Sequence, residues 1–236
     1  SSSSALNQYQ ERRTDAMMSR TRKRPLPSRR LNTMSAIAVV LVFFLAGCFV
    51  LLYFTRPVSL GLGLLSFAWY NGLYTPLKYR TAFALIIGSV IGAIPPVIGW
   101  TAAGGEVLAR QALFLAFFIY IWQVPHFILL LMLYGKDYKE AGLPVLTSFY
   151  PESGVKRIFL VWITGSVIAG IMLPFVCGVH YFFTSVLLIV LSGVLFAGMI
   201  ALVFSHTRFR VKPAFILMNV YLLLVLIILS MDRLSI

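Results

Sequence analysis

Apolar residues along this chain gather in long runs that short polar segments separate. A helix needs about 20 apolar residues to cross the hydrocarbon layer, because only helices and closed barrels satisfy every backbone polar group without water. The runs here have that length and lack the alternation that marks the strands of a membrane barrel. The pattern predicts an all-α, polytopic transmembrane helix bundle of about seven spans, at residues 33–54, 58–76, 82–101, 108–134, 158–180, 182–204 and 213–230.

The apolar stretch 158–204 decides the number of spans. It forms two spans only if the chain turns between Gly178 and Tyr181, and without that turn the orientation of every later span inverts. Composition supports the membrane interpretation, since 60% of residues are hydrophobic, 11% are charged and the mean hydropathy is +0.90. These values exclude an ordinary soluble domain. We expect residues 1–236 to form a single transmembrane domain.

Basic residues divide unevenly between the two sides that seven spans define. The amino-terminal segment, the segment near Lys78 and the segments 136–157 and 208–212 carry 17 Lys and Arg residues, against three on the other side. Short cytoplasmic loops are enriched in Lys and Arg, so the richer side is predicted to be cytoplasmic. The net charge of +13 is therefore a topology signal, and no nucleic-acid partner is expected.

Acidic residues also gather on the predicted cytoplasmic side, where topology does not require them. Asn7, Glu11 and Asp15 recur every four residues. On a helix this spacing aligns them in one stripe about 12 Å long. Carboxylate and amide oxygens suit Mg2+, which usually bridges a few carboxylates to substrate phosphates. The spacing thus indicates a metal site, and the alternative is a surface helix with local ion pairs.

A second polar cluster on the same predicted side contains Lys136, Asp137 and Tyr138, within the stretch 134–144. Two acidic clusters with cations beside them have the composition that a Mg2+-bound diphosphate needs, because the acids hold the metal and the cations neutralise the remaining phosphate charge. The alternative for the second cluster is a solvated loop.

His126 lies on the order of 12 Å inside a predicted span, where an ionisable side chain is a functional candidate. Trp122 is one helical turn away on the same face, and Pro125 should leave a helix carbonyl without its donor. The alternative is a neutral His126 that hydrogen-bonds this freed carbonyl. His180 and His206 fall in predicted loops and carry little functional weight.

Four stretches of the chain together resemble the UbiA-type intramembrane prenyltransferases. Residues Asn7 to Pro27 resemble the family's first acidic motif, approximately N-x-x-x-(D/E)-R-x-x-D-x-x-M-x-R-T-x-x-R-P-L. Residues 74–81, 87–100 and 122–144 follow in the family's order and spacing. The match is specific as far as about Leu146, whereas the last three spans match only as generic hydrophobic helices.

Two departures from the family pattern stand out. Arg13 occupies a position where the family often has another Asp, so the first acidic cluster has one acid fewer. Family members have about nine spans and carry this motif after the second, whereas this chain starts at the motif. By the resemblance, we therefore expect the family's first one to two helices to be lacking from the chain.

Within this family the resemblance is strongest to members that farnesylate heme. It implies transfer of a farnesyl group from farnesyl diphosphate to a vinyl group of heme B (protoheme IX), with addition of water, to give heme O and diphosphate. The implied cofactor is Mg2+, held by the catalytic residues Asn7, Glu11, Asp15 and Asp137. The implied substrate-binding residues are Arg20, Arg24, Lys78, Arg80, Lys136, Trp122, His126 and Tyr138.

Two other functions stay open. One is prenylation of an aromatic quinone precursor by the same family chemistry. The other is a non-catalytic membrane protein, either a truncated remnant or a transporter-like bundle. In each case the chain is expected to cross the inner (plasma) membrane several times, with the acidic clusters on the cytoplasmic face.

Overall fold

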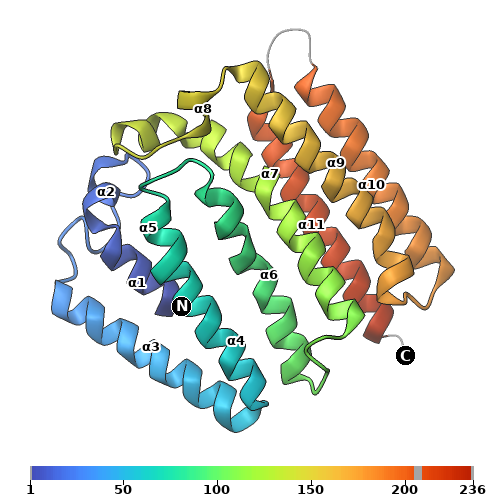
Figure 1. Ribbon diagram of the computed structural model, residues 1–236, viewed down its shortest axis with the longest axis horizontal. Coiled ribbons are helices and arrows are strands. Elements are labelled where there is room, and N and C mark those ends of the chain that lie inside the picture. Colours follow the sequence, from blue (N-terminus) through green and yellow to red (C-terminus); the bar gives the residue numbers. More distant parts are fainter. Residues whose placement is uncertain (1, 205–208, 235–236) are drawn as a thin grey trace. The chain divides into compact units, whose positions relative to one another are not determined.

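The computed structural model describes residues 2–204 and 209–234, and those residues contain helices and no strand (Figure 1). His206 lies outside the described residues. The elements are α1 Ser2–Gln10, α2 Arg12–Met17, α3 Thr33–Phe54, α4 Pro57–Ala68, η1 Trp69–Tyr74, α5 Thr75–Leu77, α6 Ala84–Ala102, α7 Arg110–Glu140, α8 Leu146–Phe149, α9 Glu152–Cys177, α10 Phe182–Val203 and α11 Val211–Leu234. The all-α prediction is confirmed.

Six of the described helices are long and apolar enough to cross a membrane, namely α3, α6, α7, α9, α10 and α11. The remaining predicted span, 58–76, is also helical, but the π-helix η1 separates α4 from α5 within it. The prediction of about seven spans is therefore approximately right. The difference is that one span is a composite of three helical pieces rather than one regular helix.

The turn that the sequence requires near His180 is present. Helix α9 ends at Cys177, and Gly178 adopts the left-handed conformation with φ 65°. A glycine ends a helix in this way because it has no Cβ to clash at positive φ. The backbone N–H groups of His180 and Tyr181 then donate to the buried carboxylate of Asp232, which ties the turn to the end of α11.

The described residues form two compact units. The first contains residues 2–107 and 134–148. In it α1 packs on α3, and α4 packs on α6. A Cβ built on Gly88 of α6 would lie 2.5 Å from the Tyr74 ring, so the glycine allows this ring to sit directly against the helix. Most apolar side chains of α3 are exposed, as expected for a helix that faces lipid.

The second unit contains residues 108–133 and 149–234, apart from the residues outside the described range. Helix α10 packs against both α9 and α11, and Phe159, Leu188 and Met218 are fully buried in the unit's core. Helix α7 contributes residues to both units, and the boundary between the units lies at Tyr134. That residue has φ −115° and ψ 15°, so the helix breaks there, while Pro125 stays within it.

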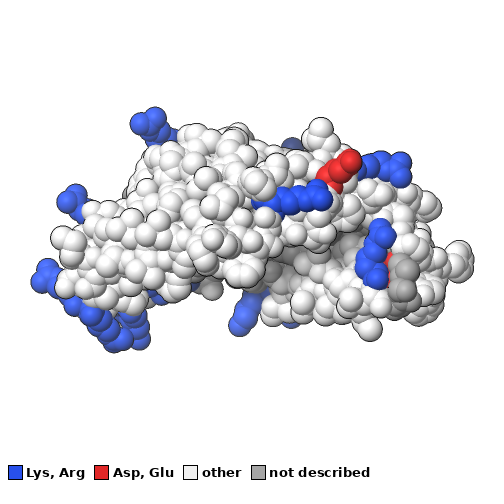
Figure 2. Space-filling model, turned by 90° about the horizontal axis from the view of Figure 1, so that it is seen from below, with Lys and Arg blue, Asp and Glu red and all other residues white. Residues whose placement is uncertain are grey.

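In the first unit, the connecting segments lie at two ends (Figure 1). In the first unit, α2, the segment after α5 and residues 134–148 share one end, and the α3–α4 turn lies at the other. Figure 2 shows the surface seen from below Figure 1: most side chains in view are uncharged, Lys and Arg side chains project at the edges with several together at the lower left, and few acids are visible.

This arrangement and the division of basic residues predict that residues 1–32 and 135–157 are cytoplasmic and that the carboxyl end after Met231 is outside. Single cysteines introduced at Ser19, Ser153 and Ser235, in a chain whose Cys48 and Cys177 are replaced, would be labelled with an impermeant maleimide in intact cells. Only position 235 should react. Labelling of position 153 from outside would contradict the predicted topology.

Candidate active site

The acidic stripe of the amino-terminal helices faces inward. Glu11 falls between α1 and α2, yet the helical hydrogen bonds continue from Glu11 N–H to Asn7 C=O and from Asp15 N–H to Glu11 C=O. The three residues therefore keep their helical spacing. Their exposed fractions are 7% for Asn7, 4% for Glu11 and 1% for Asp15. This burial excludes the alternative of a surface helix, because the stripe is directed into the first unit.

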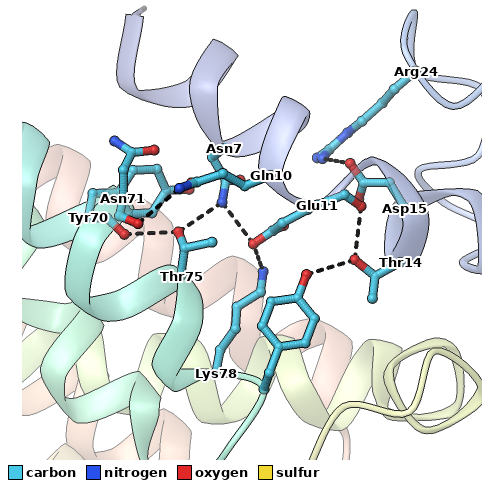
Figure 3. Close-up of polar contacts among 11 residues, drawn as sticks. Asn7, Gln10, Glu11, Thr14, Asp15, Arg24, Tyr70, Asn71, Thr75 and Lys78 are labelled. Carbon is cyan, nitrogen blue, oxygen red and sulfur yellow. Dashed lines mark hydrogen bonds and ion pairs between the residues drawn. The ribbon is translucent and has the colours of Figure 1, made fainter. Parts of the chain in front are cut away.

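The carboxylate of Glu11 receives two partners on the same oxygen, Oε1. The carboxamide nitrogen of Asn7 donates to it at 2.7 Å, and the ammonium group of Lys78 forms an ion pair with it (Figure 3). Lys78 itself is mostly buried. A buried carboxylate is costly unless a counter-charge and hydrogen bonds accompany it. Lys78, which follows α5, therefore neutralises the charge that α1 brings inside.

Asp15 is neutralised on one oxygen only. Arg24 Nη1 lies 2.8 Å from Asp15 Oδ2 (Figure 3), whereas Oδ1 is buried and has no hydrogen-bond partner among residues 2–204 and 209–234. Buried polar atoms almost always have partners, so an orphaned carboxylate oxygen needs an explanation such as an ion. This oxygen is an unused ligand of the kind that Mg2+ prefers.

Asp137 holds the loop that follows α2. The hydroxyl of Ser19 donates to both carboxylate oxygens, at 2.9 Å and 2.7 Å, and the backbone N–H of Arg20 donates to Oδ2 at 3.3 Å. The guanidinium group of Arg20 lies 5.1 Å from the centre of the Tyr134 ring. The structure therefore brings the second polar cluster against the loop that continues from the first, within one unit.

The other predicted residues of this end differ in burial. Tyr138 packs against Met18, Ala141 and Leu143 and hydrogen-bonds the Arg20 side chain. Lys136 is 90% exposed and pairs with Glu140 at 3.9 Å, so it lies in solvent. Arg80 is also exposed. Of the predicted phosphate partners, Lys78 and Arg24 contact the acidic stripe directly.

Several polar residues that sequence reasoning did not single out complete the cluster. The Thr75 hydroxyl contacts Asn7, Gln10 donates to the Asn71 carbonyl at 3.0 Å, and the Thr14 and Tyr79 hydroxyls lie 3.0 Å apart. Partial burial raises the pKa of the Tyr79 hydroxyl, which therefore stays protonated at neutral pH. One sequence signal could have pointed to these residues. Pro76 frees a helix carbonyl in a span that also carries polar side chains, so a polar contact to this span was to be expected.

The acidic cluster does not form a complete metal cage by itself. No group of three or more His, Cys, Asp or Glu side chains within the described residues lies close enough to hold a metal ion. Mg2+ usually keeps waters and uses one or two carboxylates together with substrate phosphates. Asp15 Oδ1, with Glu11 and the Asn7 carboxamide on the same stripe, fits that mode of binding.

The second unit contains Trp122 and His126, and their rings stack with centroids 4.9 Å apart, as one helical turn predicts. Trp122 Nε1 donates to the Met218 carbonyl at 3.1 Å. Nδ1 of His126 is buried without a hydrogen-bond partner in the described part of the chain. The carbonyl that Pro125 frees, that of Ile121, accepts from Ser166 at 3.2 Å instead. The alternative in which His126 bonds this carbonyl is therefore wrong.

The chain was compared with known proteins. A model of the UbiA prenyltransferase family matches residues 1–229. A protein of Geobacter sulfurreducens named protoheme IX farnesyltransferase is 42% identical over 171 residues, which cover 72% of this chain and 63% of the relative. A protein of the same name from Nitratidesulfovibrio vulgaris (strain Hildenborough) is 35% identical over 235 residues, which cover 99% of this chain and 79% of the relative.

A third relative, named protoheme IX farnesyltransferase 1, comes from Pseudomonas fluorescens and is 39% identical over 173 residues. These residues cover 73% of this chain and 57% of the relative. The chain thus spans about three fifths of the length of several relatives that it matches. No solved structure matches the chain.

The ion pair between Lys78 and Glu11 leads to a prediction about stability. Lys78→Met leaves a buried carboxylate without its counter-charge, which should cost on the order of 3 kcal/mol. Thermal unfolding of the purified chain in metal-free detergent solution measures this loss. Lys136→Met is the matched control, because an exposed pair of this kind is worth under about 1 kcal/mol. Equal unfolding temperatures for the two variants would contradict the role given to Lys78.

Proposed function

Because the chain belongs to the UbiA prenyltransferase family, we propose that it transfers a farnesyl group from farnesyl diphosphate to heme B. Carbon 1 of the farnesyl group bonds to the terminal carbon of a heme vinyl group, and diphosphate leaves. Water then adds to the neighbouring carbon and releases a proton, which gives heme O. The observation that carries the proposal is the buried acid and cation cluster of Asn7, Glu11, Asp15, Lys78 and Arg24.

The cluster suits the ionisation of an allylic diphosphate. The carbon–oxygen bond breaks more easily when the charge developing on the leaving diphosphate is neutralised, and preorganised charges in a buried site do this effectively. Bound Mg2+ would supply Lewis-acid neutralisation of that charge. Asn7, Glu11, Asp15 and Asp137 are the residues proposed to hold it, and the unpartnered Oδ1 of Asp15 supports this assignment.

The cations beside the acids are the proposed diphosphate partners. Lys78 and Arg24 are each paired with a carboxylate through a single oxygen contact, so a diphosphate that brings its own metal can exchange those contacts for phosphate oxygens. Arg20 lies on the loop that Asp137 fixes, with its backbone N–H on the carboxylate. Arg80 and Lys136 are exposed and are proposed only as outer contacts for the incoming charge.

Apolar helices would hold the farnesyl chain and keep bulk water from the allylic cation. For the acceptor, His126 is the proposed contact, with Trp122 stacked on it. The support is that Nδ1 of His126 is buried without a partner in the described residues, whereas the Ile121 carbonyl that Pro125 frees accepts from Ser166. The proposed location is the inner membrane, with the acidic cluster on the cytoplasmic face, which the basic loops support.

The relatives' names favour heme over the other acceptor. A family match alone fits either heme or an aromatic quinone precursor, whereas the three relatives described above carry names that refer to protoheme IX. The unpartnered Oδ1 of Asp15, buried in the described part of the chain, argues against a non-catalytic remnant, because a buried acceptor is costly when no ligand uses it.

The proposal predicts that Asp15→Ala lowers turnover far more than it weakens farnesyl binding, since the carboxylate acts where charge develops and the apolar chain is held elsewhere. The expected loss of heme O formation is about 10²- to 10³-fold. Membranes that contain the chain would receive heme B, farnesyl diphosphate and Mg2+, and the heme products would be separated and weighed by mass spectrometry.

Glu152→Ala is the control for this experiment, because Glu152 is an acid paired with Lys156 at the start of α9 and outside the acidic stripe. It should retain activity. Undiminished heme O formation by Asp15→Ala would refute the metal role while leaving the acceptor intact. A chain that prenylates an aromatic quinone precursor and leaves heme B unchanged would instead establish the alternative substrate.

A further inference from the structure

The π-helix η1 gives Thr75 two bonds to one carbonyl. In an α-helix each N–H bonds the carbonyl four residues back, but the Thr75 N–H bonds the Tyr70 carbonyl, five residues back. The Thr75 hydroxyl also donates to the Tyr70 carbonyl, at 2.9 Å (Figure 3). A threonine hydroxyl has a single proton. Since the Tyr70 carbonyl takes that proton, the Thr75 oxygen is left as an acceptor.

Pro76 explains why η1 offers a free carbonyl to α1 at this point. A proline has no N–H, so the carbonyl that would pair with residue 76 in the π register, that of Asn71, loses its helix donor. The Gln10 side chain donates to this carbonyl at 3.0 Å. Two carbonyls of the π-helix are thus satisfied by side chains, one from α1 and one from Thr75. The irregular turn fixes α1 against α5 by hydrogen bonds.

The nitrogen of the Asn7 carboxamide faces the segment formed by η1 and α5. Asn7 Nδ2 donates to Thr75 Oγ1 at 3.1 Å and to Glu11 Oε1 at 2.7 Å (Figure 3). Both N–H groups are therefore used. If the carboxamide were flipped, its oxygen would face a carboxylate and a hydroxyl whose proton is already committed, which is repulsive on both sides. The Thr75 hydroxyl and Glu11 together fix which way the amide points.

We propose that Thr75 is a positioning residue for the metal ligand Asn7, and that its hydroxyl keeps Asn7 Oδ1 turned away from the segment formed by η1 and α5 and toward a divalent cation. The inference rests on the proposed function, because it gives a role to the same site. Only the oxygen of a carboxamide binds a cation, so an amide free to flip would spend part of its time presenting NH2 to the metal. Residues that orient a ligand in this way typically change metal affinity 10- to 100-fold.

Thr101 provides a close match for Thr75 without the acidic contact. Its hydroxyl donates to the carbonyl one turn back, that of Val97, at 2.9 Å, and lies 2.8 Å from the Ser59 hydroxyl on another helix of the first unit. The exposed fractions are 0% for Thr101 and 3% for Thr75. The same Thr→Val change at the two positions therefore removes the same kind of bond. Only Thr75→Val releases the Asn7 carboxamide.

The test measures binding of Mn2+, which stands in for Mg2+, to the full chain in detergent with saturating inorganic pyrophosphate, by electron paramagnetic resonance. Thr75→Val should raise the Kd for Mn2+ at least about 10-fold. Thr75→Ser, which restores the hydroxyl, should bind within about twofold of the unaltered chain, and Thr101→Val should bind like it. Unfolding temperatures without metal report any general loss of packing. Thr75→Ala replaces Thr75→Val if the valine variant does not accumulate.

A double variant checks that Thr75 acts through Asn7. Asn7→Ala removes the carboxamide, so adding Thr75→Val to it should raise the Kd no further. The inference is overturned if Thr75→Val binds Mn2+ as tightly as the unaltered chain, or if Thr101→Val weakens binding as much as Thr75→Val does. It is also overturned if the losses of affinity from Asn7→Ala and Thr75→Val add in the double variant. If the unaltered chain binds no Mn2+ with pyrophosphate, the metal site of the proposed function is refuted together with the role of Thr75. If the unaltered chain binds Mn2+ and Thr75→Val binds it equally well, only the role of Thr75 is refuted.

Discussion

The desolvation of Glu11 and Asp15 is the constraint on which the first unit depends. Two carboxylates inside an apolar helix bundle are stable only with counter-charges, and Lys78 and Arg24 supply them. Because Lys78 follows the composite span and Arg24 lies in the loop after α2, the two ion pairs connect separate segments of the chain. The same charges that hold the fold together are those that a metal and a diphosphate would use.

The irregular helix beside the acids serves both stability and chemistry. Pro76 breaks the hydrogen-bond ladder and η1 shifts it by one residue, so Gln10 donates to the freed Asn71 carbonyl, while the Tyr70 carbonyl accepts from both the N–H and the hydroxyl of Thr75. A regular helix would have satisfied the Asn71 carbonyl internally and left Gln10 of α1 without this partner. The cost of the π-helix is thereby offset by hydrogen bonds to α1, and π-helices are often found at functional sites.

Much of the fold was predictable, because the length of apolar runs and the glycine turn at 178 are local properties of the sequence. The stripe of Asn7, Glu11 and Asp15 also followed from helical spacing. Spacing did not predict the π-helix, the Ser19 contacts to Asp137 or the Ser166 bond to the carbonyl freed by Pro125. The two serine bonds join residues more than 40 positions apart, so local pattern carries no signal for them. For the π-helix, Pro76 indicates a break in the hydrogen-bond ladder but not the shift by one residue.

The central claim is that the cations now paired with the acids are exchanged onto a diphosphate when a metal binds. A structure of the chain with Mn2+ and pyrophosphate, in which anomalous scattering locates the manganese, tests it most directly. The account predicts manganese on Asp15 Oδ1 and on the stripe shared with Asn7 and Glu11, with Lys78 and Arg24 turned to phosphate oxygens. Manganese bound elsewhere, with both ion pairs intact, would contradict it.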